Sequence, residues 1–252
     1  MKTMFEPSEN KQKIVMLWAP PRSISTLFEK TFLQRPDTAV VHEPFCAVYY
    51  FSKWRRASYE GEVEELLDYD AQAALQRISS QVAPLVLVKE MAFEMLPYID
   101  KDFFRSVINT FIVRPPREII ASVYKQGNYS FSEEEFGFTS LEEIWKIVIE
   151  EFGQEPILVE ANRFRRHPKE VLSRYCDRIG VKFDPLMLDF KIHELPLMPY
   201  QIPFLVWWET ALNSTEIMPP PDTELKVDIR PEHLNMIERA EKIYEKLARS
   251  AL

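Results

Sequence analysis

Ile14-Val15-Met16-Leu17-Trp18-Ala19-Pro20-Pro21-Arg22-Ser23-Ile24-Ser25-Thr26-Leu27 is the stretch of sequence that decides the fold. Its apolar first half predicts a buried strand, and the residues after the two prolines predict a helix. When a strand feeds directly into a helix, the first N–H groups of that helix point at the turn, with the positive end of the helix dipole behind them. The turn is therefore predicted to bind an anion, with phosphate favoured.

The side chains of this turn strengthen the prediction. Arg22 brings a planar, permanent positive charge. Three hydroxyl donors stand beside it: Ser23, Ser25 and Thr26. The turn is not the Gly-x-x-x-x-Gly-Lys-Ser/Thr loop of nucleoside triphosphatases, because it lacks both glycines and the lysine. The plainer interpretation is an ordinary helix start capped by Ser23.

The run Pro20-Pro21-Arg22-Ser23-Ile24-Ser25-Thr26 resembles the phosphosulfate loop of the sulfotransferases that use 3′-phosphoadenosine 5′-phosphosulfate (PAPS). That family has Pro-x-Lys/Arg-Ser-x-Ser/Thr-Thr here, often with Gly where this chain has Ile24. The resemblance implies that Arg22 relieves charge on the leaving phosphate. It also implies that six residues bind the cofactor: Pro21, Arg22, Ser23, Ile24, Ser25 and Thr26.

A second resemblance lies further along the chain. The apolar residues 111–113 predict the end of a buried strand, and Pro115-Pro116 suits the start of a helix. Arg114 then stands at the carboxyl end of the strand, and Ser122 lies about two turns into the helix. An Arg and a Ser at this spacing resemble the pair that holds the 3′-phosphate of PAPS in the sulfotransferases. A solvated charge and a surface hydroxyl are the alternative.

Alternation of short apolar runs with helical patterns predicts an α/β fold with a central parallel sheet flanked by helices. The predicted strands lie near 13–19, 38–42, 84–89, 107–113 and 156–160. The last of them is followed by a helix that starts at Pro168 and stops at Gly180, an order that is also similar to the family. The resemblance implies the P-loop nucleotide-kinase-like sulfotransferase fold.

Candidate bases follow two of the strands. His42-Glu43 ends the second strand, where several branches of the family have a catalytic Glu, and histidine is the residue type that most often acts as a general base. Lys89-Glu90 ends the third strand, with Lys89 a candidate contact to the sulfuryl oxygens and Glu90 a fallback base. Other branches carry Lys-x-His there, but this chain has Met91 at the His position. Structural ion pairs or caps at strand ends are the alternative.

Residues 191–222 are rich in proline and poorly patterned, which predicts a lid or a wall of the acceptor pocket. Trp207 and Trp208 of this segment, together with Phe45, are the candidate substrate-binding residues. Flat aromatic faces beside Glu43 and Glu90 suit an aromatic or a cationic acceptor. Core packing is the alternative for the two tryptophans.

Composition frames these predictions. The 252 residues, 46% hydrophobic and with no linker-like stretch, predict a single domain over 1–252 with a polar tail at 1–12. No membrane span or signal peptide is recognised, which predicts a cytoplasmic protein without a membrane partner. A net charge of −8 disfavours nucleic acid as a partner. Cys46 and Cys176 have no metal-ligand spacing and predict reduced, buried thiols.

We therefore predict a PAPS-dependent sulfotransferase that moves a sulfuryl group in line, without a metal, to a hydroxyl or amine of a small molecule and leaves adenosine 3′,5′-bisphosphate (PAP). A natural product or secondary metabolite is one candidate class of acceptor. The sequence leaves the acceptor and the oligomeric state open. Two alternatives stand beside this prediction. One is a P-loop kinase or nucleotidase that acts on a small molecule. The other is a nucleotide-binding homologue without catalysis, motivated by Ile24 and Met91.

Overall fold

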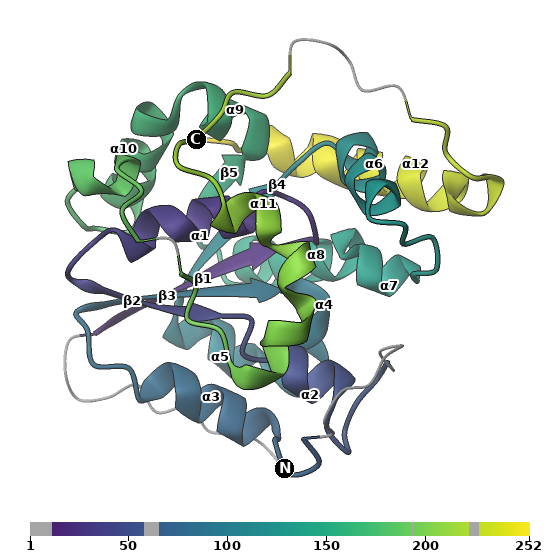
Figure 1. The fold of residues 1–252 in the computed structure, drawn as a ribbon. Helices are drawn as coiled ribbons and strands as arrows, with labels where there is room; N and C mark the ends of the chain where they lie inside the picture. The colour runs from purple at the N-terminus through teal and green to yellow at the C-terminus, as the bar shows by residue number, and fades with distance from the viewer. Residues whose placement is uncertain (1–11, 58–65, 193, 222–226) are drawn as a thin grey trace.

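A computed structural model of the chain describes residues 12–57, 66–192, 194–221 and 227–252. At its centre is a sheet of parallel strands in the order β2-β3-β1-β4-β5 (Figure 1). The strands are β1 (Lys13–Ala19), β2 (Thr38–His42), β3 (Leu85–Met91), β4 (Ile108–Val113) and β5 (Leu158–Glu160). Each lies where the apolar runs predict it, with ends shifted by two residues at most. The predicted α/β fold is confirmed.

Helices cover both faces of the sheet (Figure 1). They are α1 (Ser25–Leu33), α2 (Cys46–Tyr50), α3 (Ala71–Ser79), α4 (Ala92–Met95), α5 (Lys101–Ser106), α6 (Pro116–Lys125), α7 (Glu133–Phe136), α8 (Phe138–Trp145), α9 (Ala161–Arg166), α10 (Pro168–Arg178), α11 (Glu209–Leu212) and α12 (Leu234–Ala248). Short 3₁₀ and π segments join them: η1 (Leu96–Tyr98), η2 (Lys146–Glu151), η3 (Pro185–Leu188), η4 (Pro199–Trp207) and η5 (Pro231–His233). The final helix α12 directly follows the 3₁₀ turn η5, which begins at Pro231.

Residues of β1 alternate between two hydrophobic clusters, because successive side chains of a strand point to opposite faces. Met16 and Trp18 pack with residues of α3, α5, α6, α8 and α12. Val15 and Leu17 pack with residues of α1, α9 and α10. Coverage on both faces explains why the strand is apolar throughout instead of alternating with polar residues.

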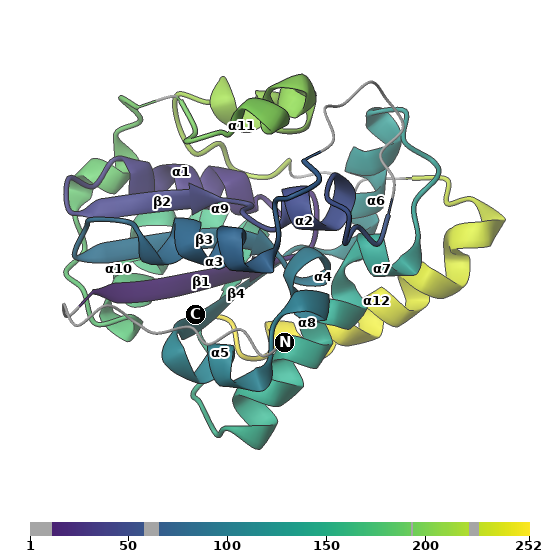
Figure 2. The same cartoon turned by 90° about the horizontal axis from the view of Figure 1, so that it is seen from below.

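The segment predicted as a lid is anchored to α1, and Figure 2 shows η4 and α11 on that side of the sheet. The buried ammonium of Lys30 donates to the carbonyl oxygens of Ala211, Leu212 and Ser214 at 2.7–2.9 Å. The side chain of Gln34 accepts from the backbone N–H of Ile192 at 2.9 Å. These hydrogen bonds hold the segment in place, although its sequence has no regular apolar pattern that would pack it as a helix or strand.

Two further predictions meet the structure here. Most of the predicted polar tail, residues 1–11, lies outside the described residues. Within the described part of the chain, none of the helices combines the length and the apolar character that crossing a membrane requires.

Candidate functional site

The carboxyl ends of four neighbouring strands bring the predicted site residues to one edge of the sheet. The register places His42 of β2 beside Lys89 of β3, and Met91 of β3 beside Ala19 of β1. Arg114 directly follows β4, which pairs with β1 on its other side. Along this edge stand, in order, the candidate bases, the anion-binding turn and the Arg114 segment.

Backbone strain marks the same residues. Among the described residues other than glycine, three have a positive φ: Arg22 (58°), Ile24 (71°) and Glu43 (40°). Such conformations cost about 1–3 kcal/mol each and gather at functional sites. Ile24 is the N-cap of α1 and has a left-handed conformation that glycine adopts without cost, which explains why the family often has Gly there. The alternative of a helix capped by Ser23 is wrong, because Ile24 takes that position.

The turn fits an anion at its centre. Ser23 is fully buried, and its hydroxyl has no hydrogen-bond partner among the described residues. Burying a hydroxyl without a partner costs free energy, so such a group is a candidate for binding a ligand. Ser25 and Thr26, also buried, follow in the first turn of α1. These hydroxyls and the open helix start match the phosphate group that PAPS carries at its 5′ position.

The two arginines and Ser122 also meet. Arg22 Nε donates to Ser122 Oγ at 3.0 Å, and Arg114 Nη1 donates to the carbonyl oxygen of Arg22 at 3.1 Å. Arg114 Nε pairs with Glu118 at 2.9 Å. Burial lowers the pKa of Arg22, and the charge of Arg114 lowers it further. Two guanidinium groups that repel each other are stabilised by an anion between them. This cluster therefore fits a second phosphate.

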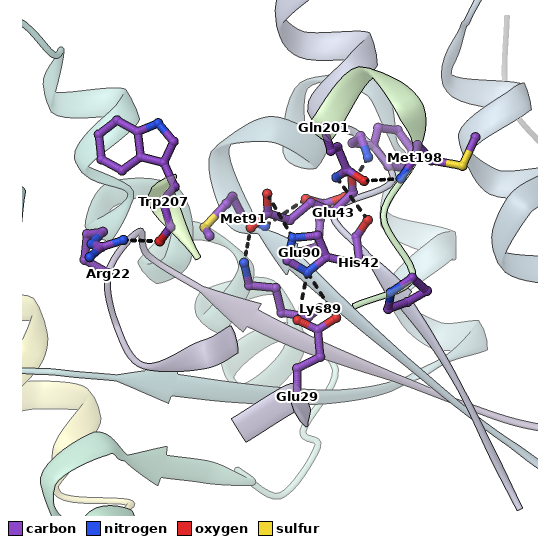
Figure 3. A network of polar contacts seen from close by, with 12 residues as sticks. Arg22, Glu29, His42, Glu43, Lys89, Glu90, Met91, Met198, Gln201 and Trp207 are labelled. Atoms are coloured by element: carbon purple, nitrogen blue, oxygen red, sulfur yellow. Dashed lines mark hydrogen bonds and ion pairs between the residues drawn. The ribbon is translucent and has the colours of Figure 1, made fainter. Parts of the chain in front are cut away.

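A buried network of hydrogen bonds and ion pairs surrounds the candidate bases (Figure 3). His42 Nδ1 lies 2.8 Å from Glu29 Oε2, and both side chains are fully buried. Because a carboxylate only accepts, this contact places the imidazole proton on Nδ1. His42 Nε2 is then an acceptor; it has no hydrogen-bond partner among the described residues and lies 3.7 Å from Glu43 Oε2. The ring of Trp208 packs edge-on against the imidazole at 4.7 Å and holds it in place.

Glu43 and Glu90 have opposite protonation preferences. Burial opposes ionisation of Glu43, but the charge of Lys89, which forms an ion pair with it, lowers its pKa. Burial raises the pKa of Glu90 to about 8, although its oxygens accept the N–H groups of Phe45 and Met91 at 2.8 Å. At neutral pH the edge therefore holds an ionised Glu43 beside a largely protonated Glu90.

The candidate substrate-binding residues are spread over this region. Trp207 is half-buried, and its carbonyl oxygen accepts from Arg22 (Figure 3). Trp208 is buried against His42. The ring of Phe45 is fully buried in the core. Contact of these three with substrate stays a prediction.

Sequence reasoning missed three residues of the site: Glu29, Glu94 and Gln201. Gln201 Nε2 donates to the carbonyl oxygen of His42 at 3.4 Å and so connects η4 to the end of β2. Glu29 had a signal in the sequence, because Glu29-Lys30 stands between the apolar pairs Leu27-Phe28 and Phe32-Leu33, and buried charges need partners.

Comparison with known proteins identifies the family of the chain. Residues 13–228 match a family model described as a sulfotransferase domain. The chain belongs to the sulfotransferase family. This membership confirms the family and the enzyme class that the sequence predicted.

Two solved structures share the fold of this sulfotransferase. The sulfotransferase domain of the Synechococcus PCC 7002 olefin synthase is 16% identical, with a TM-score of 0.51 and coverage of 94% of this chain and 98% of that one. The sulfotransferase domain from the curacin biosynthetic pathway is 15% identical, with a TM-score of 0.54 and the same coverage.

The curated relatives carry names of another kind. The chain is 24% identical over 210 residues to branched-chain-amino-acid aminotransferase-like protein 2 of Arabidopsis thaliana. The alignment covers 82% of this chain and 37% of that protein. Branched-chain-amino-acid aminotransferase-like protein 1 of the same plant is 24% identical over 234 residues. That alignment covers 92% of this chain and 41% of the relative. The chain thus spans about two fifths of the length of these relatives.

Proposed function

We propose that this chain transfers the sulfuryl group of PAPS to a hydroxyl or amine of a small molecule. The observation that carries the proposal is the order of groups along the sheet edge. The anion turn after β1 and Arg114 after β4 suit a donor with two phosphate positions. The buried bases after β2 and β3 lie on the other side of the same turn, where an acceptor would meet the sulfuryl group.

The chain's own residues divide the work of binding the donor. Residues 21–26 hold the 5′-phosphosulfate, with the unpartnered hydroxyl of Ser23 as one donor. Arg114 and Ser122 hold the 3′-phosphate, and Arg22 lies between the two groups. When bound, PAPS supplies a sulfuryl group whose bond to the phosphate oxygen breaks as its bond to the acceptor forms, with PAP as the leaving group. Arg22 and the helix start then stabilise the charge that grows on the phosphate.

Removal of the acceptor proton is assigned to His42. Its Nε2 is the free acceptor of the cluster, whereas the carboxylate of Glu43 is engaged by Lys89. Glu29 accepts a hydrogen bond from Nδ1 and so keeps the ring proton there. It also stabilises the imidazolium that forms when Nε2 takes the proton of the sulfuryl acceptor. Glu43, 3.7 Å from Nε2, is the alternative base and adds a second negative charge beside the imidazolium. Lys89 remains the candidate contact to the sulfuryl oxygens.

The setting of the reaction belongs to the proposal as well. Both cysteines, Cys46 and Cys176, are buried free thiols, in keeping with a reducing compartment such as the cytoplasm. The partner proposed is a small-molecule acceptor, with neither nucleic acid nor a membrane involved.

Isothermal titration of PAP, with ATP and Mg²⁺ as the comparison, tests the donor site before an acceptor is known. We expect micromolar or tighter binding of PAP and little binding of ATP. The reverse preference would favour the P-loop kinase or nucleotidase. Binding of neither would overturn the proposal. PAP binding without turnover of PAPS over a broad acceptor panel would instead favour the non-catalytic homologue.

A further inference from the structure

A second buried acid lies beside the candidate bases, and the proposed reaction does not use it. Glu94 of α4 is 4% exposed, and its Oε2 has no hydrogen-bond partner among the described residues. A carboxyl oxygen of Glu94, one of Glu43 and the sulfur of Cys46 all lie within 4.8 Å of one another. The protonated Glu94 carboxyl can share a hydrogen bond with Glu90, but its Oε2 lacks a donor, and a ligand that supplies one would satisfy it.

Charge around Glu94 favours a positive ligand. Three buried carboxyl groups, those of Glu43, Glu90 and Glu94, gather near the ammonium of Lys89. Burial, and the carboxyl groups of Glu90 and Glu43, raise the pKa of Glu94 well above its usual range. Glu90 and Glu94 therefore keep protons that a bound cation would displace.

Aromatic rings complete the surroundings. Tyr49 packs edge-on against Tyr50 at 4.8 Å and against Phe93 at 5.1 Å. Burial raises the pKa of both tyrosines, and the charge of an ionised Glu94 raises it further, so this carboxyl lies within electrostatic reach of the two rings. The hydroxyl of Tyr50 donates to Glu135 at 3.4 Å, so a further acid lies behind these rings. Aromatic faces next to carboxylates are the usual environment of organic ammonium ions.

A metal ion suits this cluster less well than an ammonium ion. Lys89 forms an ion pair with Glu43, and this ammonium would repel a divalent cation beside the same carboxylate. Burial and the surrounding carboxyl groups also raise the pKa of Cys46, which keeps the thiol protonated, whereas metals bind the thiolate. An ammonium ion needs only hydrogen-bond acceptors and aromatic faces.

We propose that the acceptor is an amino alcohol or diamine whose protonated amine binds Glu94 while its nucleophilic group reaches His42 and Glu43. The short separation of the Glu43 and Glu94 oxygens, within 4.8 Å, sets the two groups of the acceptor a few bonds apart. The identity of the acceptor rests on the proposed function, but the amine site does not require donor binding.

Two probes of the same shape test the amine site by isothermal titration at neutral pH. They are 2-amino-1-phenylethanol and 1-phenyl-1-propanol. The first carries an ammonium group where the second carries a methyl group. We expect the Kd of the amino alcohol to be at least tenfold lower, because the free energy of a hydrogen bond to a charged group exceeds the difference that a tenfold change in Kd requires. Titration in two buffers of different ionisation enthalpy should show that protons are released when the amine binds. No preference for the amine, whether both probes bind or neither does, overturns the proposal.

The Glu94→Gln variant locates the effect. Glutamine has the shape of the protonated acid, so the fold should be kept, but it cannot ionise against an amine. The preference for the amine and the proton release should both be lost, while PAP binding stays unchanged. Glu151→Gln, at an exposed ion pair with Lys101, is the matched control and should leave the preference intact. A preference that persists in Glu94→Gln overturns the assignment. Loss of PAP binding in the wild type would sink the proposed function alone, because amine binding is measured separately.

Discussion

Replacing Lys89 by methionine tests whether the ion pair with Glu43 is structural as well as functional. Both side chains are buried, with exposed fractions of 0% for Lys89 and 5% for Glu43. Removing one partner of a buried pair leaves an uncompensated charge and costs about 3–5 kcal/mol of folding free energy. For a chain of this size each kcal/mol shifts Tm by about 2–4 °C. We therefore expect Lys89→Met to lower Tm by roughly 6–20 °C.

The loss should also depend on pH in a defined direction. In the wild type the Glu43 pKa is lowered on folding, so the stability from this pair is present above the unfolded pKa and lost as pH falls through the folded pKa. Without Lys89, burial dominates and the Glu43 pKa rises, so Glu43 takes up a proton when the variant folds. The variant should thus recover stability as pH falls, and the gap to wild type should narrow between pH 8 and pH 5. Urea unfolding at both values measures it.

Matched variants decide whether burial is the cause. Lys101→Met removes a lysine from the pair with Glu151, whose side chains are 55% and 48% exposed, and exposed pairs are worth only about 0.2–1 kcal/mol. The double variant Lys89→Met with Glu43→Gln removes both charges and should restore much of the stability. If Lys89→Met costs no more than Lys101→Met, or if its cost is the same at both pH values, the electrostatic reasoning is refuted.

Three further predictions concern Arg114 of the donor site, the buried acid Glu90 and the two thiols. Arg114→Ala should weaken PAP binding roughly 10- to 150-fold, since charged hydrogen bonds contribute about 1.5–3 kcal/mol, whereas Arg117→Ala, which breaks an outward pair with Glu241, should leave it unchanged in the same titration. Because the Glu90 pKa is raised to about 8, its ionisation costs stability as pH rises from the unfolded value towards 8. Glu90→Gln should therefore gain stability relative to wild type between pH 5 and pH 8 in urea unfolding, and a constant difference would contradict this. Cys46 and Cys176, both buried with raised pKa values, should react with Ellman's reagent only after unfolding, and prompt reaction in the native protein would disprove their burial.

What the sequence could predict depends on how local the signal is. The strands and the anion turn are encoded in contiguous residues, and the carboxyl ends of parallel strands must meet at one edge. His42, Lys89 and Arg114 could therefore be placed together without knowing any tertiary contact. The pairing of His42 with Glu29 could not, because it depends on how α1 packs over β2. The same holds for Glu94, which follows β3 on a short helix whose four residues carry no readable period.

The segment predicted as a lid shows why the sequence suggests a donor but leaves the acceptor open. Its irregular backbone is held by long-range contacts, such as those from Lys30, which leave no pattern in the sequence. Yet its consecutive tryptophans touch both halves of the site, because the Trp207 carbonyl accepts from Arg22 while the Trp208 ring packs on His42. The Arg22 guanidinium has five N–H donors in a fixed fork, so a donor phosphate can bind the N–H groups that Ser122 and this carbonyl do not use. Under the proposed function, one arginine then contacts both the donor and the residue next to Trp208. We therefore expect donor binding to influence the packing of the proposed base, so the acceptor does not follow from the side chains of this segment alone.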